Sequence, residues 1–438
     1  MTKPLESNMA SKASVAAPRG DAVAEQEAAA AVAAAGRAAR AAAGQLRRMP
    51  ADGLDETLRA IAARLGERAA EVAAANAQDV QAARADGLAS AFVDRLTLDA
   101  GRIAAMADQL RSLAEVGAEQ DRVRIRDLSD GLELQEWRRP VGVIGANFEA
   151  RPNVVVDIAS QLIKSRNAGV LRTGSSAIGS AAVLIDQVVG PAMASTGLDP
   201  AAVQLLRSPG RQTAFALVRE PALIPLVILR GSGESTRALA REAALHGVRT
   251  LAHADGGAVI YLDSSADRAL ALRLIEASLD RLGVCNRLNL LLIHQETWDA
   301  MVPSVTELTQ RLGVAISLPP QRHPLGLEWA LEAGSEATIT VAPAAGPADA
   351  AAIANTETSG LAAAIVAEDA AAAGEFLDAY AGTGAFWNAS PRLLDGFKLL
   401  SLPETGINID AVPGPRGPVT FRDLYLRQYA VIPRRPAV

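Results

Sequence analysis

The chain has 438 residues, of which half are hydrophobic and only 3% are aromatic, and its net charge is −6. This length is too great for one hydrophobic core and predicts two or three domains of a soluble, helix-rich α/β protein. Acidic and basic residues are interspersed and stacking aromatics are scarce, which argues against nucleic acid as a partner. The longest apolar runs are interrupted by charges or prolines before the roughly 20 residues that a membrane span needs, so no membrane association is expected.

The first third of the chain is predicted to be helical. Residues 1–20 contain basic residues but no apolar stretch, which predicts a disordered tail rather than a secretory signal. From residue 21 to about 118 the pattern is helical throughout, with alanine-rich runs such as 27–43. Residues 123–137 then alternate around Ser129-Asp130-Gly131, which predicts a β-hairpin that docks on another element or subunit.

Alternating strands and helices follow and predict a parallel sheet with helices on both faces. Strands are expected at 141–145, 168–172, 203–206 and 226–230, and helices at 154–165 and 175–188. The strand ends carry small-residue loops at Gly145, Arg172–Ser176 and Arg230–Ser235, which suit an anionic ligand at a helix N-terminus. Neither a Gly-x-Gly-x-x-Gly fingerprint nor a Walker lysine loop is present.

A second block of strands and helices begins at residue 258. Strands are expected at 258–263, 288–293, 362–366 and 384–388, helices at 267–282, 297–312 and 370–380, and a low-complexity loop or linker at 342–352. The tail at 418–433 alternates weakly and is expected to extend the sheet of the hairpin. The four histidines have no metal-ligand spacing, so no metal site is predicted.

Cys285 is the only cysteine, so it cannot form an internal disulfide and its role is either packing or reactivity. Gly283 ends the helix predicted before it, and a buried strand is predicted from Leu288. Cys285 is therefore expected on a turn where its sulfur can face a cleft. A reduced lone thiol without an export signal predicts a cytoplasmic location.

Several segments resemble the gamma-glutamyl phosphate reductases (glutamate-5-semialdehyde dehydrogenases) of the aldehyde dehydrogenase superfamily. They are Arg139–Gly145, Phe148–Val154, Lys164–Ala168, Leu171–Ser175, Gly283–Asn286, Asn388–Gly396 and Glu404–Ile407. The resemblance covers the chain from about residue 25 to its end. It implies NADPH-dependent reduction of L-glutamyl 5-phosphate to L-glutamate 5-semialdehyde, with release of phosphate, in proline biosynthesis.

The same resemblance implies the domain organisation. A Rossmann-like NADP-binding domain is expected at 21–122 and 142–257, and an α/β catalytic domain at 258–411. A small β element for oligomerisation is expected at 123–141 and 412–438, so the protein is expected to be a homodimer or homotetramer.

Roles for individual residues also follow from the resemblance. Cys285 is expected to attack the acyl phosphate and carry a thioester that the nicotinamide reduces, with the amide of Asn153 (alternatively Asn147 or Asn286) and the Cys285 N–H stabilising the oxyanion. The substrate is expected to contact Arg151, His253 and Asn286. The cofactor, NADPH rather than NADH, is expected to contact Arg172, Thr173, Gly174, Ser175, Gly231, Ser232 and Glu404.

Two segments depart from the family pattern. In 355–363, Leu361 and Ala363 stand where the family has a histidine and a carboxylate, and in 411–418 only Arg416-Gly417-Pro418 matches. Two alternatives therefore remain open. The chain could reduce a different acyl phosphate or glutamyl derivative, or it could be a catalytically silent homologue that serves as a binding subunit.

Overall fold

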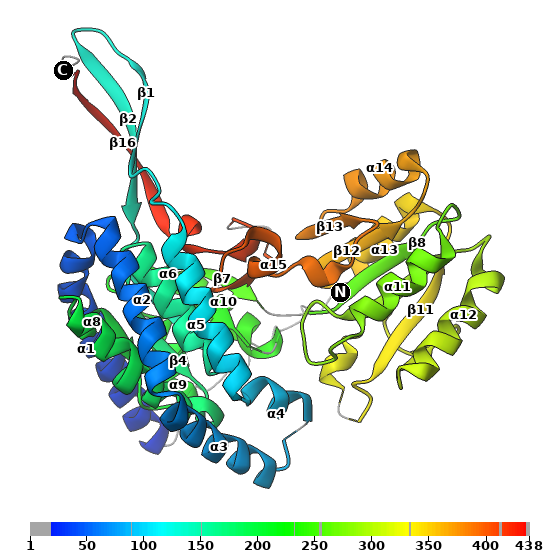
Figure 1. Cartoon of the computed structure of the whole chain (residues 1–438), viewed down its shortest axis with the longest axis horizontal. Helices are drawn as coiled ribbons and strands as arrows, with labels where there is room; N and C mark the ends of the chain where they lie inside the picture. The colour runs from blue at the N-terminus through cyan, green and yellow to red at the C-terminus, as the bar shows by residue number, and fades with distance from the viewer. Residues whose placement is uncertain are drawn as a thin grey trace, which may run out of the picture.

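The computed structural model describes residues 19–434, apart from 89, 150, 232, 254–255, 333 and 411–413. Figure 1 shows a helical body around one sheet, a second group of helices around another sheet, and a long ribbon that stands out from the first body. Residues 1–18 of the predicted tail lie outside the described residues, and Arg19 begins the first helix.

Among the described residues five helices precede the first strand, which confirms the helical pattern predicted from residue 21 to about 118. They are α1 (Arg19–Arg48), α2 (Ala51–Glu67), α3 (Ala69–Ala85), α4 (Ser90–Leu96) and α5 (Ala100–Glu115). Alanine favours these helices intrinsically, and a stripe of larger apolar residues fixes their packing. In α2 that stripe includes Leu58, Ile61 and Leu65, all buried. Asp99 caps α5 by accepting a 2.8 Å hydrogen bond from the Arg102 N–H.

The first sheet has five parallel strands in the order β5-β4-β3-β6-β7. They are β3 (Val143–Phe148), β4 (Ala168–Thr173), β5 (Val203–Leu205), β6 (Leu226–Arg230) and β7 (Arg249–His253). The helical segments around them are α6 (Asn153–Lys164), η1 (Ser175–Ala177), α7 (Ile178–Val183), η2 (Leu184–Val189), α8 (Gly190–Ser195), η3 (Pro200–Ala202), α9 (Arg211–Leu217) and α10 (Gly233–Leu245). The predicted parallel sheet is confirmed. Its strand order reverses between β3 and β6, and ligands of doubly wound sheets bind beyond the carboxyl ends of the strands at such a point.

The second sheet has six parallel strands in the order β10-β11-β9-β8-β12-β13. They are β8 (Ala258–Leu262), β9 (Leu288–His294), β10 (Ala315–Ser317), β11 (Thr338–Ala344), β12 (Ala362–Val366) and β13 (Gly384–Trp387). The accompanying helical segments are α11 (Arg268–Ser278), α12 (Trp298–Arg311), η4 (Trp329–Leu331), α13 (Pro347–Glu357), α14 (Ala370–Ala379), η5 (Pro391–Leu393) and α15 (Gly396–Leu400). Successive residues of β8 are buried on opposite faces, because Ile260 packs with α11 and α12 while Tyr261 packs with α13 and α14.

The two sheets meet end to end. β7 finishes at His253 and the chain enters β8 at Ala258, so the carboxyl edge of the first sheet is directed at the amino edge of the second. Residues from both edges line one cavity, described below. At this junction Arg230 and His253 are held by strand ends, and Cys285 by the turn that leads into β9.

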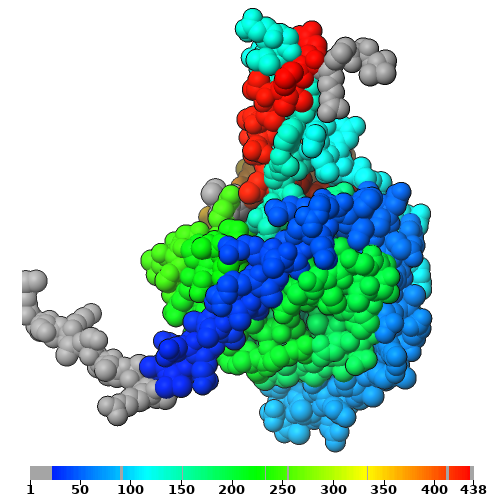
Figure 2. Space-filling view, turned by 90° about the vertical axis from the view of Figure 1, so that its left-hand side faces the viewer, coloured from blue at the N-terminus to red at the C-terminus, as the bar shows by residue number. Residues whose placement is uncertain are grey.

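The ribbon is a three-stranded antiparallel sheet in the order β1-β2-β16. Its strands are β1 (Arg122–Asp127), β2 (Leu132–Pro140) and β16 (Tyr425–Pro433). The hairpin and its extension by the tail are confirmed. Asp130 and Gly131, with φ of 57° and 69°, supply the left-handed turn that joins β1 to β2. Figure 2 shows the ribbon projecting from the body. A short two-stranded sheet, β14 (Gly406–Asn408) and β15 (Gly417–Val419), precedes it, and η6 (Phe421–Asp423) leads into β16.

Three predictions are wrong. The supposed loop at 342–352 is the end of β11 and the start of α13, because its alanines are small enough to be buried and favour helix. The helix expected at 267–282 ends at Ser278. Ser175–Ser195 is by length and composition apolar enough to cross a membrane, contrary to the expectation that every such run is too short, and half of it is buried inside this fold.

Candidate active site

Cys285 lies on a turn between α11 and β9, as predicted, and backbone contacts hold that turn in place. The Gly257 N–H donates a 2.7 Å hydrogen bond to the Cys285 carbonyl oxygen. A Cβ at Gly256 would lie 2.8 Å from that oxygen and 3.0 Å from the Cys285 Cα, so only glycine fits there. Gly257 has a φ of +86°, which also favours glycine. The two glycines therefore fix the position of Cys285 against the end of the β7–β8 connection.

The Cys285 side chain borders a cavity of about 220 Å³ at the junction of the two sheets. The first sheet contributes Arg151, Arg230 and His253 from its carboxyl edge, and the second contributes the Cys285 turn. The charged residues that line the cavity are Arg95, Glu149, Arg151, Arg230 and Glu328. In the described part of the chain, three guanidinium groups and two carboxylates thus surround one thiol.

Burial and charge oppose each other at the thiol. Burial raises the pKa of Cys285, and the guanidinium groups of Arg151 and Arg230 counteract part of this rise. Burial also lowers the pKa of Arg151, to about 10, and Arg230 adds to that shift. The Cys285 thiol is therefore protonated in the resting protein, with cations in place to stabilise the thiolate once it forms.

His253, predicted to contact substrate, ends β7 and lines the same cavity. Its Nδ1 accepts a 3.2 Å hydrogen bond from the Ile407 N–H, which places the ring proton on Nε2. Burial holds the pKa of His253 well below its usual range, with Arg230 and Arg151 adding to this shift. His253 is thus a neutral hydrogen-bond donor at neutral pH.

Asn153 and Glu404 lie in the charged network around this cavity, although neither lines it among the described residues. The Asn153 amide donates a 2.9 Å hydrogen bond to Asp157, and burial raises the pKa of Asp157 to about 6. Glu404 accepts a 2.8 Å hydrogen bond from the Gly396 N–H, and burial raises its pKa to about 7 against the effect of Arg230. The negative charge of Glu404 also raises the pKa of Cys285.

Only some of the residues predicted to bind the cofactor line the same cavity. A second cavity, of about 530 Å³, is lined by Arg172, Gly174 and Ser175 and shares Phe92 and Glu149 with the thiol cavity. Gly231 lines the thiol cavity instead. Thr173 is fully buried, and Ser232 lies outside the described residues. The larger cavity has the small residues and the adjacent helix starts that a dinucleotide needs, so the chain can hold one beside Cys285.

The Arg172 guanidinium forms its hydrogen bonds with other groups of the protein. Its guanidinium donates a 3.0 Å hydrogen bond to Asn147 and further bonds to the carbonyl oxygens of Pro209 and Gly210. Sequence reasoning missed Arg211, which lines the same cavity from the first turn of α9 and stacks on Phe215, 5.4 Å from the ring centre. Nothing in the local sequence distinguished Arg211 from other surface arginines.

Asn286 is buried beneath the turn rather than directed at the cavity. Its amide donates hydrogen bonds to the carbonyl oxygens of Leu394 (2.9 Å) and Arg392 (3.3 Å), and Arg392 donates to its side-chain oxygen. These bonds occupy the side chain, so Asn286 anchors the Cys285 turn. Its predicted contact with substrate is therefore not part of the function proposed below.

The two segments that depart from the family pattern are structural in this chain. Leu361 is fully buried in an apolar cluster against which Cys285 packs, and Ala363 is buried within β12. Arg416 donates hydrogen bonds to the carbonyl oxygens of Ile409 and Ala381. The described residues of these segments do not line the thiol cavity; they support its base, where the Ser359 hydroxyl donates a 2.9 Å hydrogen bond to the Gly256 carbonyl oxygen.

Comparisons with known proteins agree with this geometry. The family model described as "Aldehyde dehydrogenase family" matches residues 10–322. The chain is 34% identical over 408 residues to a gamma-glutamyl phosphate reductase of Thermobifida fusca, covering 90% of this chain and 95% of that protein. It is 36% identical over 387 residues to one of Clavibacter michiganensis, covering 86% and 88%. The crystal structure of the Thermotoga maritima gamma-glutamyl phosphate reductase superposes with a TM-score of 0.82 at 26% identity, covering 92% and 98%.

Proposed function

The chain belongs to the aldehyde dehydrogenase family, and from that membership we propose that it reduces L-glutamyl 5-phosphate to L-glutamate 5-semialdehyde with NADPH, releasing phosphate, in proline biosynthesis. The observation that carries this proposal is the position of Cys285. Its cavity opens at the meeting point of the two sheets and shares Phe92 and Glu149 with the larger cavity suited to a dinucleotide.

The charges of the thiol cavity match those of the proposed substrate. L-Glutamyl 5-phosphate carries a phosphate, a carboxylate and an ammonium group. Arg95, Arg151 and Arg230 can bind the two anionic groups, because guanidinium forms paired hydrogen bonds with phosphate and carboxylate oxygens. Glu149 and Glu328 supply negative charge for the ammonium group.

The reaction begins on the protein side with the Cys285 sulfur. Arg151 and Arg230 stabilise the thiolate, which attacks the acyl carbon, and the bond from that carbon to the phosphate oxygen breaks. The proton of the Cys285 thiol leaves with the released phosphate, so the step is balanced. The acyl group is then held as a thioester. The Cys285 N–H and the Nε2–H of His253 are the donors we assign to the oxyanion from the cavity lining. We assign the Asn153 N–H that is not bonded to Asp157 from the family resemblance.

A bound nicotinamide supplies the hydride that reduces the thioester. Cys285 then leaves as a thiolate, and the aldehyde is released. Gly174, Ser175 and Arg211 would hold the dinucleotide in the larger cavity, with Gly231 towards its nicotinamide end. Glu404 lines neither cavity among the described residues, and we assign it to the nicotinamide end from the family resemblance. Arg172 contributes to the shape of that cavity, since its hydrogen bonds are already made.

Arg211 is the residue we assign to NADPH preference over NADH. It is exposed in the cavity, and among the described residues it has no carboxylate partner. An Arg211→Ala variant is expected to raise KM for NADPH about 10- to 100-fold and to leave KM for NADH nearly unchanged. Arg207→Ala is the matched control, because Arg207 pairs with Asp186 outside the cavity. Equal effects on both cofactors would contradict the assignment.

The activity is tested by following NADPH oxidation with gamma-glutamyl phosphate generated in situ, and the reverse reaction with glutamate semialdehyde and phosphate. Turnover that Cys285→Ala abolishes, with NADPH binding retained, is the expected result. Turnover of another acyl phosphate alone would support an altered substrate, to which the apolar Leu361 beneath the thiol could contribute. A folded chain without any turnover would support the silent binding subunit.

The proposed assembly is a homodimer or homotetramer built through the ribbon. Ile125, Leu426, Tyr429 and Val431 are large apolar residues that the ribbon exposes. A ribbon of this kind is rarely stable alone, so pairing with a second copy would bury these side chains. The solution mass of the full chain tests the assembly.

We also propose a cytoplasmic location, because a cysteine nucleophile must stay reduced.

A further inference from the structure

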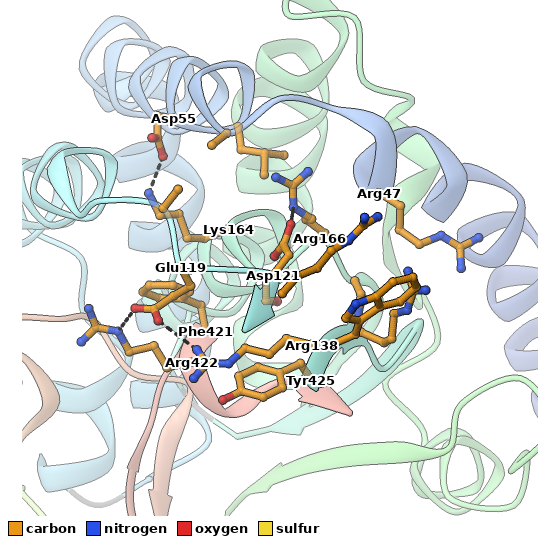
Figure 3. Close-up of a pocket in the computed structure, with 18 residues that line it drawn as sticks. Arg47, Asp55, Glu119, Asp121, Arg138, Lys164, Arg166, Phe421, Arg422 and Tyr425 are labelled. Carbon is orange, nitrogen blue, oxygen red and sulfur yellow. Dashed lines mark hydrogen bonds and ion pairs between the residues drawn. The ribbon is translucent and has the colours of Figure 1, made fainter. Parts of the chain in front are cut away.

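A third cavity, of about 460 Å³, lies at the base of the ribbon. Pro140 leads into β3, and Ser165 and Arg166 lead into β4, so the cavity lies at the amino edge of the first sheet. The Cys285 and dinucleotide cavities lie at the opposite edge, and they share no lining residue with this one. We call it the ribbon-base cavity (Figure 3).

Basic side chains dominate the ribbon-base cavity, although the whole chain is acidic. Three acidic residues line it, namely Asp55, Glu119 and Asp121. Seven basic residues line it, namely Arg47, Arg122, Arg138, Arg139, Lys164, Arg166 and Arg422. They come from α1, the ribbon, α6, the α6–β4 connection and η6, so the fold itself collects this charge from distant parts of the chain.

The three carboxylates are already paired. Asp55 lies 2.5 Å from the Lys164 ammonium. Glu119 accepts hydrogen bonds from both Arg138 (2.9 Å) and Arg422 (2.6 Å), as the dashed lines in Figure 3 show. Asp121 lies 4.0 Å from Arg166. No further acidic side chain lines the described cavity to balance the remaining cations.

The remaining cations keep unused hydrogen-bonding capacity. In the described part of the chain, Arg47 makes no ion pair, and Arg139 bonds only to the neutral side chain of Gln428, at 2.9 Å. Arg138 is paired with Glu119, yet its buried Nε has no hydrogen-bond partner there. Arg47 and Arg139 are exposed to solvent, and like charges gathered around one cavity repel one another. A ligand with several negative charges relieves this repulsion, so the arrangement favours an anionic ligand.

The aromatic rings of the cavity narrow the class of ligand. The guanidinium carbons of Arg122 and Arg139 each lie 4.4 Å from the centre of the Trp137 ring, and that of Arg138 lies 4.9 Å from the centre of the Tyr425 ring. Cations over the ring faces occupy the surfaces on which a nucleobase would stack, while guanidinium N–H edges stay available to oxyanions. The cavity therefore suits a compact anion rather than a nucleotide base.

We infer that the ribbon-base cavity is a binding site for a small molecule with two or more negative charges, carried by phosphate or carboxylate groups. Its volume is in the range of small-molecule sites. Because its walls belong to the ribbon and to the body, the bound anion also ties the ribbon to the first sheet. The inference does not depend on the reaction proposed above.

The test is calorimetric titration of the full chain with pyrophosphate and, separately, with citrate at low ionic strength. One saturable site per chain is expected. Arg47→Gln and Arg139→Gln should each weaken binding at least about 10-fold, the effect of losing one charge-assisted contact. Arg48→Gln is the matched control, because it removes the same charge at the same helix end without lining the cavity. Tighter binding of pyrophosphate or of citrate identifies the phosphate or the carboxylate class.

Two outcomes would overturn the inference. The first is binding that Arg151→Gln removes while Arg47→Gln and Arg139→Gln leave it intact, since the anion then occupies the thiol cavity. The second is no binding of either anion together with a change in solution mass of the Arg47→Gln and Arg139→Gln proteins, since a second copy of the chain then fills the cavity. Turnover of the Arg47→Gln enzyme is expected to equal that of the wild type.

Discussion

The thiol cavity and the ribbon-base cavity both gather arginines at an edge of the same sheet, yet they differ in what the cations face. Among the described residues around Cys285, three arginines are nearly balanced by two glutamates, and all surround one nucleophile. At the ribbon base, seven cations exceed three carboxylates, and the one buried lysine is already bonded to Asp55. Positive charge alone therefore indicates anion binding, and the thiol that faces the carboxyl edge of the first sheet distinguishes a site for covalent chemistry.

The largest effect expected is on turnover. Cys285→Ala should lower kcat with glutamyl phosphate by at least about 10⁴-fold, because no other group can carry the acyl intermediate. NADPH binding, measured by fluorescence titration, should stay within about twofold of the wild type. Anion binding at the ribbon base should also be unchanged. A Cys285→Ala enzyme that retains substantial turnover would remove the basis for treating the two cavities as different in kind.

The position of Cys285 could be predicted because local rules determine it, whereas the partners of Arg172 could not. Gly283 and the apolar run from Leu288 set the turn and the strand. Arg172 lies next to the last residue of β4, near the predicted edge, but its cross-strand register partner is Asn147, which takes one of its hydrogen bonds. A strand pattern predicts at which edge of the sheet a residue lies, but it does not predict which neighbouring group forms a hydrogen bond with that residue.

The ribbon-base cavity was beyond sequence analysis for a related reason. Its walls come from residues 47–55, 118–122, 137–140, 164–166 and 421–425, which no local pattern connects. The sequence indicated the hairpin and its tail but not that Glu119 would join Arg138 to Arg422. Composition also misled at 342–352, where alanine-rich sequence forms buried strand and helix.

The second prediction concerns which cations of the ribbon-base cavity stabilise the fold and which can bind a ligand. The Lys164 ammonium is buried and bonds Asp55 and the Val116 carbonyl oxygen at 2.5 and 2.7 Å. Lys164→Met should lower the free energy of unfolding by about 3–5 kcal/mol, because it leaves the Asp55 carboxylate without its partner. Urea denaturation measures this change.

The exposed pair of Arg68 and Glu71, 2.8 Å apart, supplies the matched control. Arg68→Met should cost less than about 1 kcal/mol. Adding Asp55→Leu to Lys164→Met should recover part of the loss, since the unpaired charge is then removed. Similar losses for the Lys164 and Arg68 variants would show that Lys164 is not structural and belongs with the cations available to a ligand.

The third prediction concerns the pH dependence of stability and the buried carboxyl group of Glu404. Burial raises the pKa of Glu404 from 4.5 to about 7 in the folded protein. Glu404 therefore contributes most to the free energy of unfolding below its pKa in the unfolded chain. That contribution is lost as the pH rises through its pKa in the folded protein. Glu404→Gln should therefore stabilise the protein relative to the wild type at pH 8, by up to roughly 3 kcal/mol, and much less at pH 5. Urea denaturation at both pH values tests this, and a difference that does not change with pH would refute the assignment.

The smallest effect compares one arginine from each cavity on the same measurement. Arg151→Gln should raise KM for glutamyl phosphate about 10- to 100-fold, because a charge-assisted contact to the substrate is lost, and Arg151→Lys should recover part of it. Arg47→Gln removes the same charge at the opposite edge of the sheet and should leave KM unchanged. At higher ionic strength the Arg151 effect should persist, since buried charges are weakly screened. If both variants shifted KM equally, the substrate would be responding to the overall charge of the protein, and neither cavity would be a defined anion site.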